Sequence, residues 1–462
     1  MSRNFLQELL SGIVRRGRQP GQSPTDPAQC LTALTQACET LMQPGGEASR
    51  ILVAKQALGH YASLDAEQRH AFFTLLAEEY AADPEAIHAA YAGYQEDEGN
   101  ASLQRLFAAC EPRRLRLLRR LNLCPGGTHE LVKMRADLLG LLKEAPELAP
   151  LDADFAHLFG SWFNRGFLIL ESIDWNTPAA ILEKIIRYEA VHEIHDWNDL
   201  RRRIDPEDRR CYAFFHPAIG NEPLIFVEVA LCRGIPGDIQ AILADGEEVP
   251  AEEADTAAFY SISNCQRGLK GISFGNFLIK QVAQELKREL PNLSQFVTLS
   301  PVPGFAAWLD GLREVGQCHL SAAAETALAD GTWHQDEDAR QALAPELRAL
   351  AAHYLLEAKR PQGLPLDPVA RFHLGNGASL HRLNWPGDTS PKGRRQAHGL
   401  MVNYRYELER IEQNHEAFSR DGTIACPNEL RRLASRAKPL LDAPPGTDTQ
   451  EARRGHGAEP RS

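Results

Sequence analysis

The chain has 462 residues, which is too long for one ordinary hydrophobic core and suits two domains with tails. Hydrophobic residues make up 43% and charged residues 24%, the balance of a globular protein in water, and no apolar run approaches the ~18–20 residues that span a bilayer. A formal net charge of −12 repels nucleic acid and anionic lipid, so we expect neither a nucleic-acid nor a membrane partner.

The amino-terminal part, residues 1–160, is predicted to be helical throughout. Asp65 with Gln68 matches a capping box, and Asp83 before a proline gives another helix its start. The helices are amphipathic and separated by short polar connections, which predicts a helical bundle. Residues 1–21 are expected to form a first helix and not a targeting signal, because a long apolar stretch and a small-residue cleavage site are missing.

Strand-like segments begin beyond Trp162. They are rich in β-branched and aromatic residues and are bounded by proline, glycine and asparagine, as strands are. An amphipathic helix over residues 275–290 separates the third strand from the fourth, and residues 312–360 return to helix. This order predicts an α+β protein. The predicted strands are 211–218, 223–231, 258–263 and 296–300.

The changes in composition divide the chain into three parts. The helical bundle covers residues 1–160, and a mixed α/β domain covers residues 161–440. Residues 441–462 are polar and rich in proline and glycine, which predicts a disordered tail.

Residues 266–276, with the sequence QRGLKGISFGN, lie between a predicted strand and the following helix. Glycines let a backbone approach a ligand closely, and the N–H groups at the start of a helix bind phosphate. Arg267 and Lys270 add positive charge where an anion would lie. The residues by themselves favour a phosphate site and an ordinary strand-to-helix turn about equally.

Ser300 lies in the segment LSPVPGF, at the end of the fourth predicted strand. Two prolines and a glycine fix a rigid turn and present Ser300 at the carboxyl end of the strand, where active-site side chains of α/β folds commonly lie. A structural turn in which Ser300 caps the next helix explains the same residues, and the pattern alone favours this structural interpretation.

His373 belongs to a stretch that concentrates His, Asn, Tyr, Arg and Trp among glycines. The block FHLGNGA contains His373 and Asn376, and the block MVNYRY ends at Tyr406. This composition suits a binding surface better than a packed core. A lone histidine is nevertheless more often structural than catalytic, so the pattern leaves both roles open.

Three other patterns bear on possible binding sites. The nine cysteines form no C-x-x-C pair, which argues against a zinc site and a disulfide framework and predicts a reducing, cytoplasmic location. His192 and His195 lack the H-E-x-x-H spacing and an obvious third ligand, so no metal site is expected. A basic cluster is interpreted as a solvated or interdomain face, with a phosphate clamp as the alternative. Its members are Arg201, Arg202, Arg203, Arg209 and Arg210.

In their order and spacing, these blocks resemble the malonyl-CoA decarboxylase family. The resemblance rests on FYSIS, the glycine segment leading into FLIK, LSPVPGF, FHLGNGA, an NW pair followed by Asp388 and Ser390, and MVNYRY. It covers roughly residues 160–410, and the helical part looks similar as well. The resemblance implies the N-acetyltransferase (GNAT) fold for the mixed α/β domain, with a sheet that splays to admit the pantetheine arm of CoA. It also implies a homotetramer assembled through the helical domain.

The same resemblance implies a site. Ser300 and His373 match the catalytic pair, and Tyr406 and Asn376 are candidate orienting residues. His373 is expected to donate a proton, since an ordinary imidazole titrates near neutral pH, and Ser300 to orient the substrate and relay the proton. Ser273 stands where some relatives carry an acidic residue, so a carboxylate base is not expected. The implied CoA contacts are Arg267, Gly268, Lys270, Gly271, Ile272, Ser273, Phe274, Gly275 and Asn276.

The activity implied is the decarboxylation of malonyl-CoA to acetyl-CoA and CO2 through a thioester enolate, within fatty acid metabolism. No cofactor is expected, because the thioester itself accepts the electron pair. Two alternatives are an acyl-CoA transferase of the GNAT type and a non-catalytic CoA-binding scaffold in which the helical part carries the function.

Overall fold

The computed structural model describes most of the chain, namely residues 27–244, 246–272 and 278–441. The predicted helix over residues 1–21 and the predicted tail from residue 442 onward lie outside these ranges, as do residues 273–277 of the glycine segment. None of the described helices is long and apolar enough to cross a membrane.

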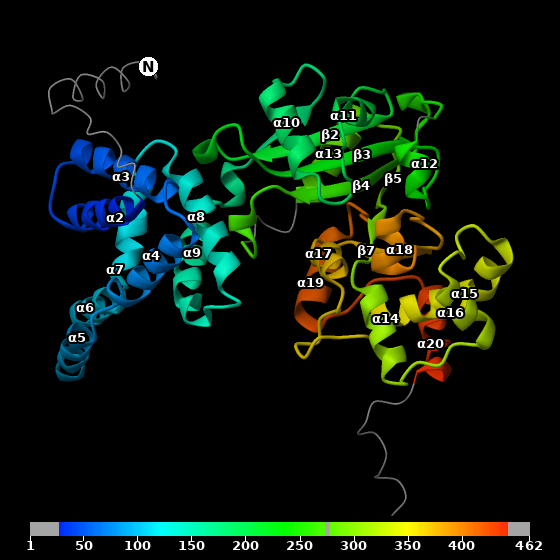
Figure 1. Cartoon of the computed structure of the whole chain (residues 1–462). Helices are drawn as coiled ribbons and strands as arrows, with labels where there is room; N and C mark the ends of the chain where they lie inside the picture. The colour runs from blue at the N-terminus through cyan, green and yellow to red at the C-terminus, as the bar shows by residue number, and fades with distance from the viewer. Residues whose placement is uncertain (1–26, 245, 273–277, 442–462) are drawn as a thin grey trace, which may run out of the picture. The chain divides into compact units, whose positions relative to one another are not determined.

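The chain divides into two compact units, which Figure 1 shows in sequence colours. The first unit extends to Ile169, and the second begins at Leu170. Two later segments, 215–224 and 266–274, belong to the first unit. The return of these two segments to the first unit was not predicted.

The first unit is a bundle of helices built on local start signals. The capping box at α4 is confirmed, because the Asp65 side chain accepts the N–H of Gln68 and the Gln68 side chain accepts the N–H of Asp65. The aromatic side chains of Phe72, Phe155 and Phe159 are fully buried in its core. The helices are α2 (Pro27–Met42), α3 (Glu47–Ala62), α4 (Ala66–Glu78), α5 (Pro84–Glu96), α6 (Asn100–Cys110), α7 (Arg113–Leu121), α8 (Gly127–Leu141) and α9 (Ala149–Trp162).

The second unit is built on a mixed sheet. In the described residues the strand order is β1-β2-β3-β4-β5-β8-β6, and β7 also pairs with β8. The β4–β5 pair is parallel, and the pairs on either side of it, β3–β4 and β5–β8, are antiparallel. The strands are β1 (Ile169–Ile173), β2 (Arg209–Phe215), β3 (Pro223–Cys232), β4 (Thr256–Asn264), β5 (Gln295–Thr298), β6 (Ser300–Pro301), β7 (Ser379–Asn384) and β8 (Met401–Arg405).

Helices fill the connections between these strands. The helix predicted over residues 275–290 is observed as α13, and the helical stretch predicted over residues 312–360 is divided among three helices, α14 to α16. The α+β class, a helical part followed by a mixed sheet, is confirmed. The helices are α10 (Ala179–Tyr188), α11 (Trp197–Ile204), α12 (Ile239–Leu243), α13 (Leu278–Glu289), α14 (Phe305–Glu314), α15 (Ala322–Asp330), α16 (Glu337–Leu356), α17 (Pro368–Gly375), α18 (Pro391–Ala397), α19 (Ile411–Asp421) and α20 (Asn428–Ser435).

The two central strands separate partway along their length. The β4–β5 ladder ends at the pair Phe259 and Thr298, after which β4 continues to Asn264. The neighbouring segment leaves β4 after Leu299 but stays paired with β8, with Val297 opposite Arg405 and Ser300 opposite Val402. The loss of pairing with β4 opens the sheet, and Ser300 lies at the point of opening.

Candidate active site

Ser300 is held at the opening by the backbone pairing of β6 with β8. Its hydroxyl oxygen lies 2.8 Å from the hydroxyl oxygen of Thr298 and 3.0 Å from Nε2 of His373. The side chain is buried among these groups, and it does not cap the following helix α14, whose N-cap is Gly304. The structural-cap interpretation of Ser300 is therefore wrong.

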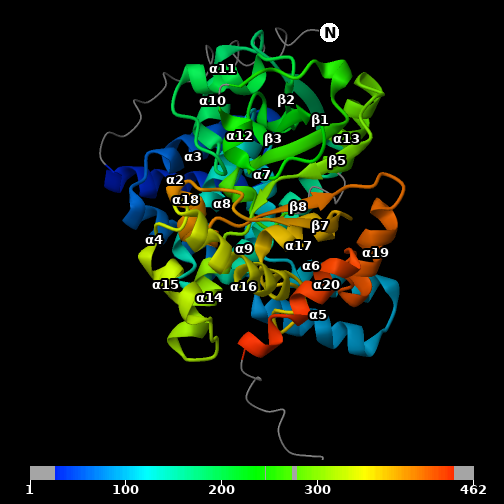
Figure 2. The ribbon, with the colours of Figure 1, turned by 90° about the vertical axis from the view of Figure 1, so that its right-hand side faces the viewer.

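His373 comes from the last turn of α17, which lies beside β7 (Figures 1 and 2). The helix begins at Pro368, with a proline in its first turn, and the buried carboxylate of Asp367 accepts the N–H of Ala370 at 2.8 Å. Such an N-cap fixes the start of the helix, and through it the place of the histidine two turns later.

Two tyrosines of one chain segment fix the imidazole of His373. The hydroxyl oxygen of Tyr406 lies 2.9 Å from Nδ1, and the ring of Tyr404 stacks on the imidazole with centroids 4.6 Å apart. Ser300, His373 and Tyr406 therefore form one hydrogen-bonded row, although 73 residues separate the first two.

The electrostatics of this row differ from those of a serine hydrolase. Burial lowers the pKa of His373 to about 3 and raises the pKa of Tyr406 well above its ordinary value, so both groups are neutral at pH 7. Nδ1 faces a phenol where a hydrolase histidine faces a carboxylate, and a phenol does little to stabilise an imidazolium. His373 was expected to donate a proton because an ordinary imidazole titrates near neutral pH. Burial removes this reason, so any proton that His373 gives comes from the neutral imidazole.

A cavity of about 250 Å³ opens beside Ser300 and His373. Its described lining is mainly apolar and contains neither a lysine, an arginine nor a carboxylate. The lining residues are Val191, Phe259, Tyr260, Ile262, Asn264, Ser300, Pro301, Pro368, Val369, Phe372 and His373. A cavity of this composition can exclude water around a reacting group but offers it no counterion.

Asn376, the fourth residue predicted for the catalytic centre, lies at the end of α17 and does not join the row. Its side-chain amide donates to the carbonyl oxygen of Phe372 at 2.7 Å, and its backbone N–H donates to Phe372 and His373. Asn376 therefore closes the helix that carries the histidine.

The described part of the glycine segment belongs to the first unit, where it packs on α8. Arg135 of α8 donates to the carbonyl oxygens of Gly268 and Lys270 at 2.8 and 3.0 Å. A Cβ on Gly268 would lie 1.8 Å from the carbonyl oxygen of Val132, so only glycine fits there. Gly271, with φ of +80°, also needs the conformational freedom of glycine.

The charged residues predicted for CoA binding, Arg267 and Lys270, are exposed, and Ile272 is half-buried. Ser273, Phe274, Gly275 and Asn276 lie outside the described residues. The predicted CoA contacts thus stay a prediction.

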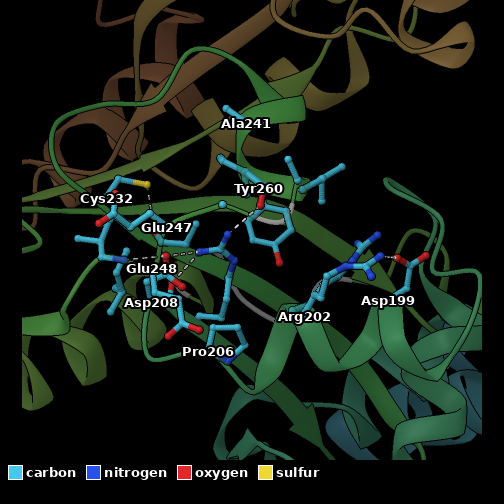
Figure 3. Close-up of a pocket in the computed structure, with 18 of the residues that line it drawn as sticks. Asp199, Arg202, Pro206, Asp208, Cys232, Ala241, Glu247, Glu248 and Tyr260 are labelled. Atoms are coloured by element: carbon cyan, nitrogen blue, oxygen red, sulfur yellow. Dashed lines mark hydrogen bonds and ion pairs between the residues drawn. The ribbon is translucent and has the colours of Figure 1, made fainter.

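The arginines of the basic cluster are paired. Each of the five has an aspartate or glutamate side chain as its partner, in the pairs Arg201–Asp205, Arg202–Asp199, Arg203–Glu228, Arg209–Asp208 and Arg210–Glu289. Several of these pairs border a second cavity of about 640 Å³, which Figure 3 shows with the hydroxyl of Tyr260 directed into it. Within the described residues, His192, His195 and their neighbours include no group of three side chains that could hold a metal ion.

Two residues of the site were not predicted. Thr298 touches Ser300, and Tyr404 stacks on His373. Each precedes a predicted site residue by two positions, and side chains two apart share a face of a strand. This periodicity could have identified both.

Comparisons with known proteins identify the family of this chain. Two family models match, the malonyl-CoA decarboxylase N-terminal domain over residues 80–163 and the C-terminal domain over residues 166–443. The mitochondrial malonyl-CoA decarboxylase of Anser anser anser is 41% identical over 356 residues, 70% of each chain. That of Rattus norvegicus is 38% identical over 360 residues, 72% of this chain and 73% of the relative.

Solved structures give the same result. The malonyl-CoA decarboxylase of Rhodopseudomonas palustris is 53% identical with a TM-score of 0.84, covering 88% of this chain and 100% of its own. That of Agrobacterium vitis is 50% identical with a TM-score of 0.82, covering 87% and 99%. Fold and site define an α+β protein whose opened sheet presents a buried serine and histidine to an uncharged cavity. The chain belongs to the malonyl-CoA decarboxylase family.

Proposed function

We propose that this chain converts malonyl-CoA to acetyl-CoA and CO2. The observation that carries the proposal is the row of Ser300, His373 and Tyr406 at the opening of the sheet, beside a cavity whose described lining is uncharged. Membership of the family supplies the substrate.

Decarboxylation breaks the bond between C2 and the carboxylate carbon of the malonyl group. The electron pair passes into the thioester, CO2 leaves and an enolate remains, which takes one proton at C2 to give the acetyl group. Because the thioester accepts the electron pair, we propose that the reaction uses no cofactor.

The cavity favours the loss of CO2 because it offers the carboxylate neither water nor, among the described lining residues, a cation. A carboxylate that enters it loses its water and finds no cation among the described lining residues, whereas neutral CO2 and the delocalised enolate lose less. A hydrogen bond from Ser300 to the developing enolate oxygen would contribute about 3–4 kcal/mol, the scale of one oxyanion-hole donor.

A neutral donor suffices for the second step, because a thioester enolate is a stronger base than an alkoxide or an imidazolate. We propose that C2 takes the proton of the Ser300 hydroxyl and that Ser300 regains it from Nε2 of His373. His373 is then an imidazolate, whose Nδ1 accepts the hydrogen bond of Tyr406, and a proton from solvent restores the neutral imidazole after the product leaves.

The remaining features of the proposal come from the family resemblance. The segment from Arg267 to Asn276 binds the phosphates of CoA, the helical unit joins four copies into a homotetramer, and the enzyme works in fatty acid metabolism. The cytoplasmic location is proposed from the cysteine pattern and not from the resemblance. No disulfide joins the nine cysteines, all of which lie in the described residues, and this fits a reducing compartment. Light scattering of the purified chain tests the tetramer.

The activity is tested by incubating the purified protein with malonyl-CoA labelled in its free carboxylate. Release of labelled CO2 with one acetyl-CoA per CO2, in the absence of any acceptor, is the expected result. Acetyl transfer that needs an added amine or alcohol would establish the transferase instead, and CoA binding without turnover would establish the scaffold.

A further inference from the structure

Thr298, the last residue of β5, has no accessible surface and is held by contacts with both neighbouring strands, β4 and β8. Its backbone pairs with Phe259 of β4, and its carbonyl oxygen accepts the side-chain amide of Asn403 at 2.7 Å. Its hydroxyl oxygen accepts the backbone N–H of Tyr404 at 3.1 Å. These contacts leave the threonine hydroxyl in one fixed place, facing Ser300.

The contact between the two hydroxyls has a direction. Ser300 donates to Thr298 over 2.8 Å, and a hydroxyl carries one proton. The oxygen of Ser300 therefore has only a lone pair to offer Nε2 of His373, which lies 3.0 Å away. Nε2 must then be the donor, so the imidazole proton lies on Nε2. Nδ1 is then an acceptor, and Tyr406, whose buried hydroxyl faces it at 2.9 Å, donates to it.

We infer that Thr298 is a positioning residue that sets the direction of this row. Thr298 accepts the hydrogen bond of the Ser300 hydroxyl, so the neutral imidazole of His373 must direct its N–H toward Ser300. In this arrangement His373 can return a proton to Ser300 after Ser300 has given its own to the substrate. The inference rests on the proposed roles of Ser300 and His373, and it adds a residue that the family resemblance did not supply.

Removal of the Thr298 hydroxyl should reverse the direction of the hydrogen bond between Ser300 and His373. Without a hydroxyl at position 298, the proton of Ser300 has Nε2 of His373 as its remaining acceptor in the row, so the imidazole proton moves to Nδ1. His373 can then no longer return a proton to Ser300. We expect kcat to fall about 10²-fold, the lower end of what a positioned acid–base group contributes, while KM for malonyl-CoA changes less than about threefold.

The experiment compares Thr298→Val, which keeps the shape and removes the hydroxyl, with Thr298→Ser, which keeps the hydroxyl. Thr298→Ala repeats the removal if the valine variant does not fold. Thr256→Val is the matched control, because Thr256 is equally buried, lies on the neighbouring strand, and donates to Asp255. We expect the control and Thr298→Ser to stay within about threefold of the parent in kcat.

The decisive readout is the tautomer of His373 in the substrate-free protein, observed by ¹⁵N NMR with labelled histidine and assigned with His373→Gln. The inference requires the proton on Nε2 in the parent and in Thr298→Ser, and on Nδ1 in Thr298→Val. A proton on Nδ1 in the parent, or an unchanged tautomer in Thr298→Val, would overturn it even in an active decarboxylase. An inactive parent that shows the tautomer switch would instead overturn the proposed function and leave the direction of the row intact.

Discussion

Two cavities of the second unit both have Tyr260 in their lining and differ in charge. The larger, about 640 Å³, is bordered by arginines and carboxylates that pair with each other, as Figure 3 shows for Arg202 and Asp199. The smaller, about 250 Å³, has only neutral groups in its described lining and holds Ser300 and His373. The arginines that stand out in the sequence pair with carboxyl groups, whereas the candidate catalytic residues lie in a cavity whose described lining is uncharged.

This difference has a physical basis. A paired arginine gives little to a new anion, because its partner already satisfies it. A dry cavity without a counterion, by contrast, disfavours an ionised carboxylate and favours its conversion to neutral CO2. The five predictions below test this contrast, from the largest expected effect to the smallest.

Replacement of the central residue of the small cavity should have the largest effect. In His373→Ala we expect kcat to fall about 10²–10⁴-fold, the range of a general acid–base group, with CoA affinity changed less than about threefold. Release of labelled CO2 and calorimetric titration with CoA measure the two quantities. His381→Ala, on β7, is the control and should keep kcat within about twofold. Unchanged turnover in His373→Ala would remove this residue from the mechanism.

The pair beside the large cavity should matter for stability. Glu228 has no accessible surface, and its carboxylate lies 3.1 Å from Arg203. Glu228→Ala leaves a buried guanidinium without its partner, which should lower the free energy of unfolding by about 3–5 kcal/mol. Urea denaturation measures this loss, and a loss below 1 kcal/mol would show that the pair is replaceable.

The same carboxylate should make stability depend on pH. Burial, with repulsion from Glu189, raises the pKa of Glu228 from 4.5 to about 8. The folded protein therefore binds more protons than the unfolded chain between these values, and its stability falls as pH rises, by at most about 1.4 kcal/mol per pH unit. Denaturation at pH 5, 6.5 and 8 should show a steeper fall in the parent than in Glu228→Gln. Equal slopes would contradict the raised pKa.

A cation introduced into the small cavity should slow the reaction. Phe372 lines the cavity and is 36% exposed, so a longer polar side chain can be accommodated there. In Phe372→Lys the ammonium pairs with the bound carboxylate, and we expect KM and kcat to fall together, kcat by about tenfold, as stronger ground-state binding requires. Phe372→Met is the neutral control. A higher kcat in the lysine variant would refute the role given to the uncharged lining.

Loss of an arginine at the large cavity should change little. Arg202 pairs with Asp199 near the surface, and such pairs contribute about 0–1 kcal/mol. Arg202→Ala should keep KM for malonyl-CoA within about twofold and the melting temperature within a few degrees. A tenfold rise in KM would restore the phosphate-clamp interpretation of the basic cluster.

The sequence by itself determined the local structure and the candidate residues. The helix starts at Asp65 and Asp83 could be predicted because a cap depends on neighbours three residues away. Strands β2, β3, β4 and β5 were predicted from their β-branched and aromatic residues, and α13 from the spacing of its apolar residues. Strands β1, β7 and β8 were not predicted. Ser300, His373 and Tyr406 were found through ordered blocks that resemble a family, each of them weak alone.

Only the tertiary structure decided how these residues act. The separation of the chain from β4, together with its pairing to β8, brings Ser300 to His373 across 73 residues, a contact that no local pattern encodes. Burial then makes the imidazole neutral, and Thr298 gives its hydrogen bonds their direction. Arg203 and Arg210 likewise pair with Glu228 and Glu289, which are distant in sequence. Propensity and capping act over a few residues, whereas desolvation and pairing depend on which distant segments meet.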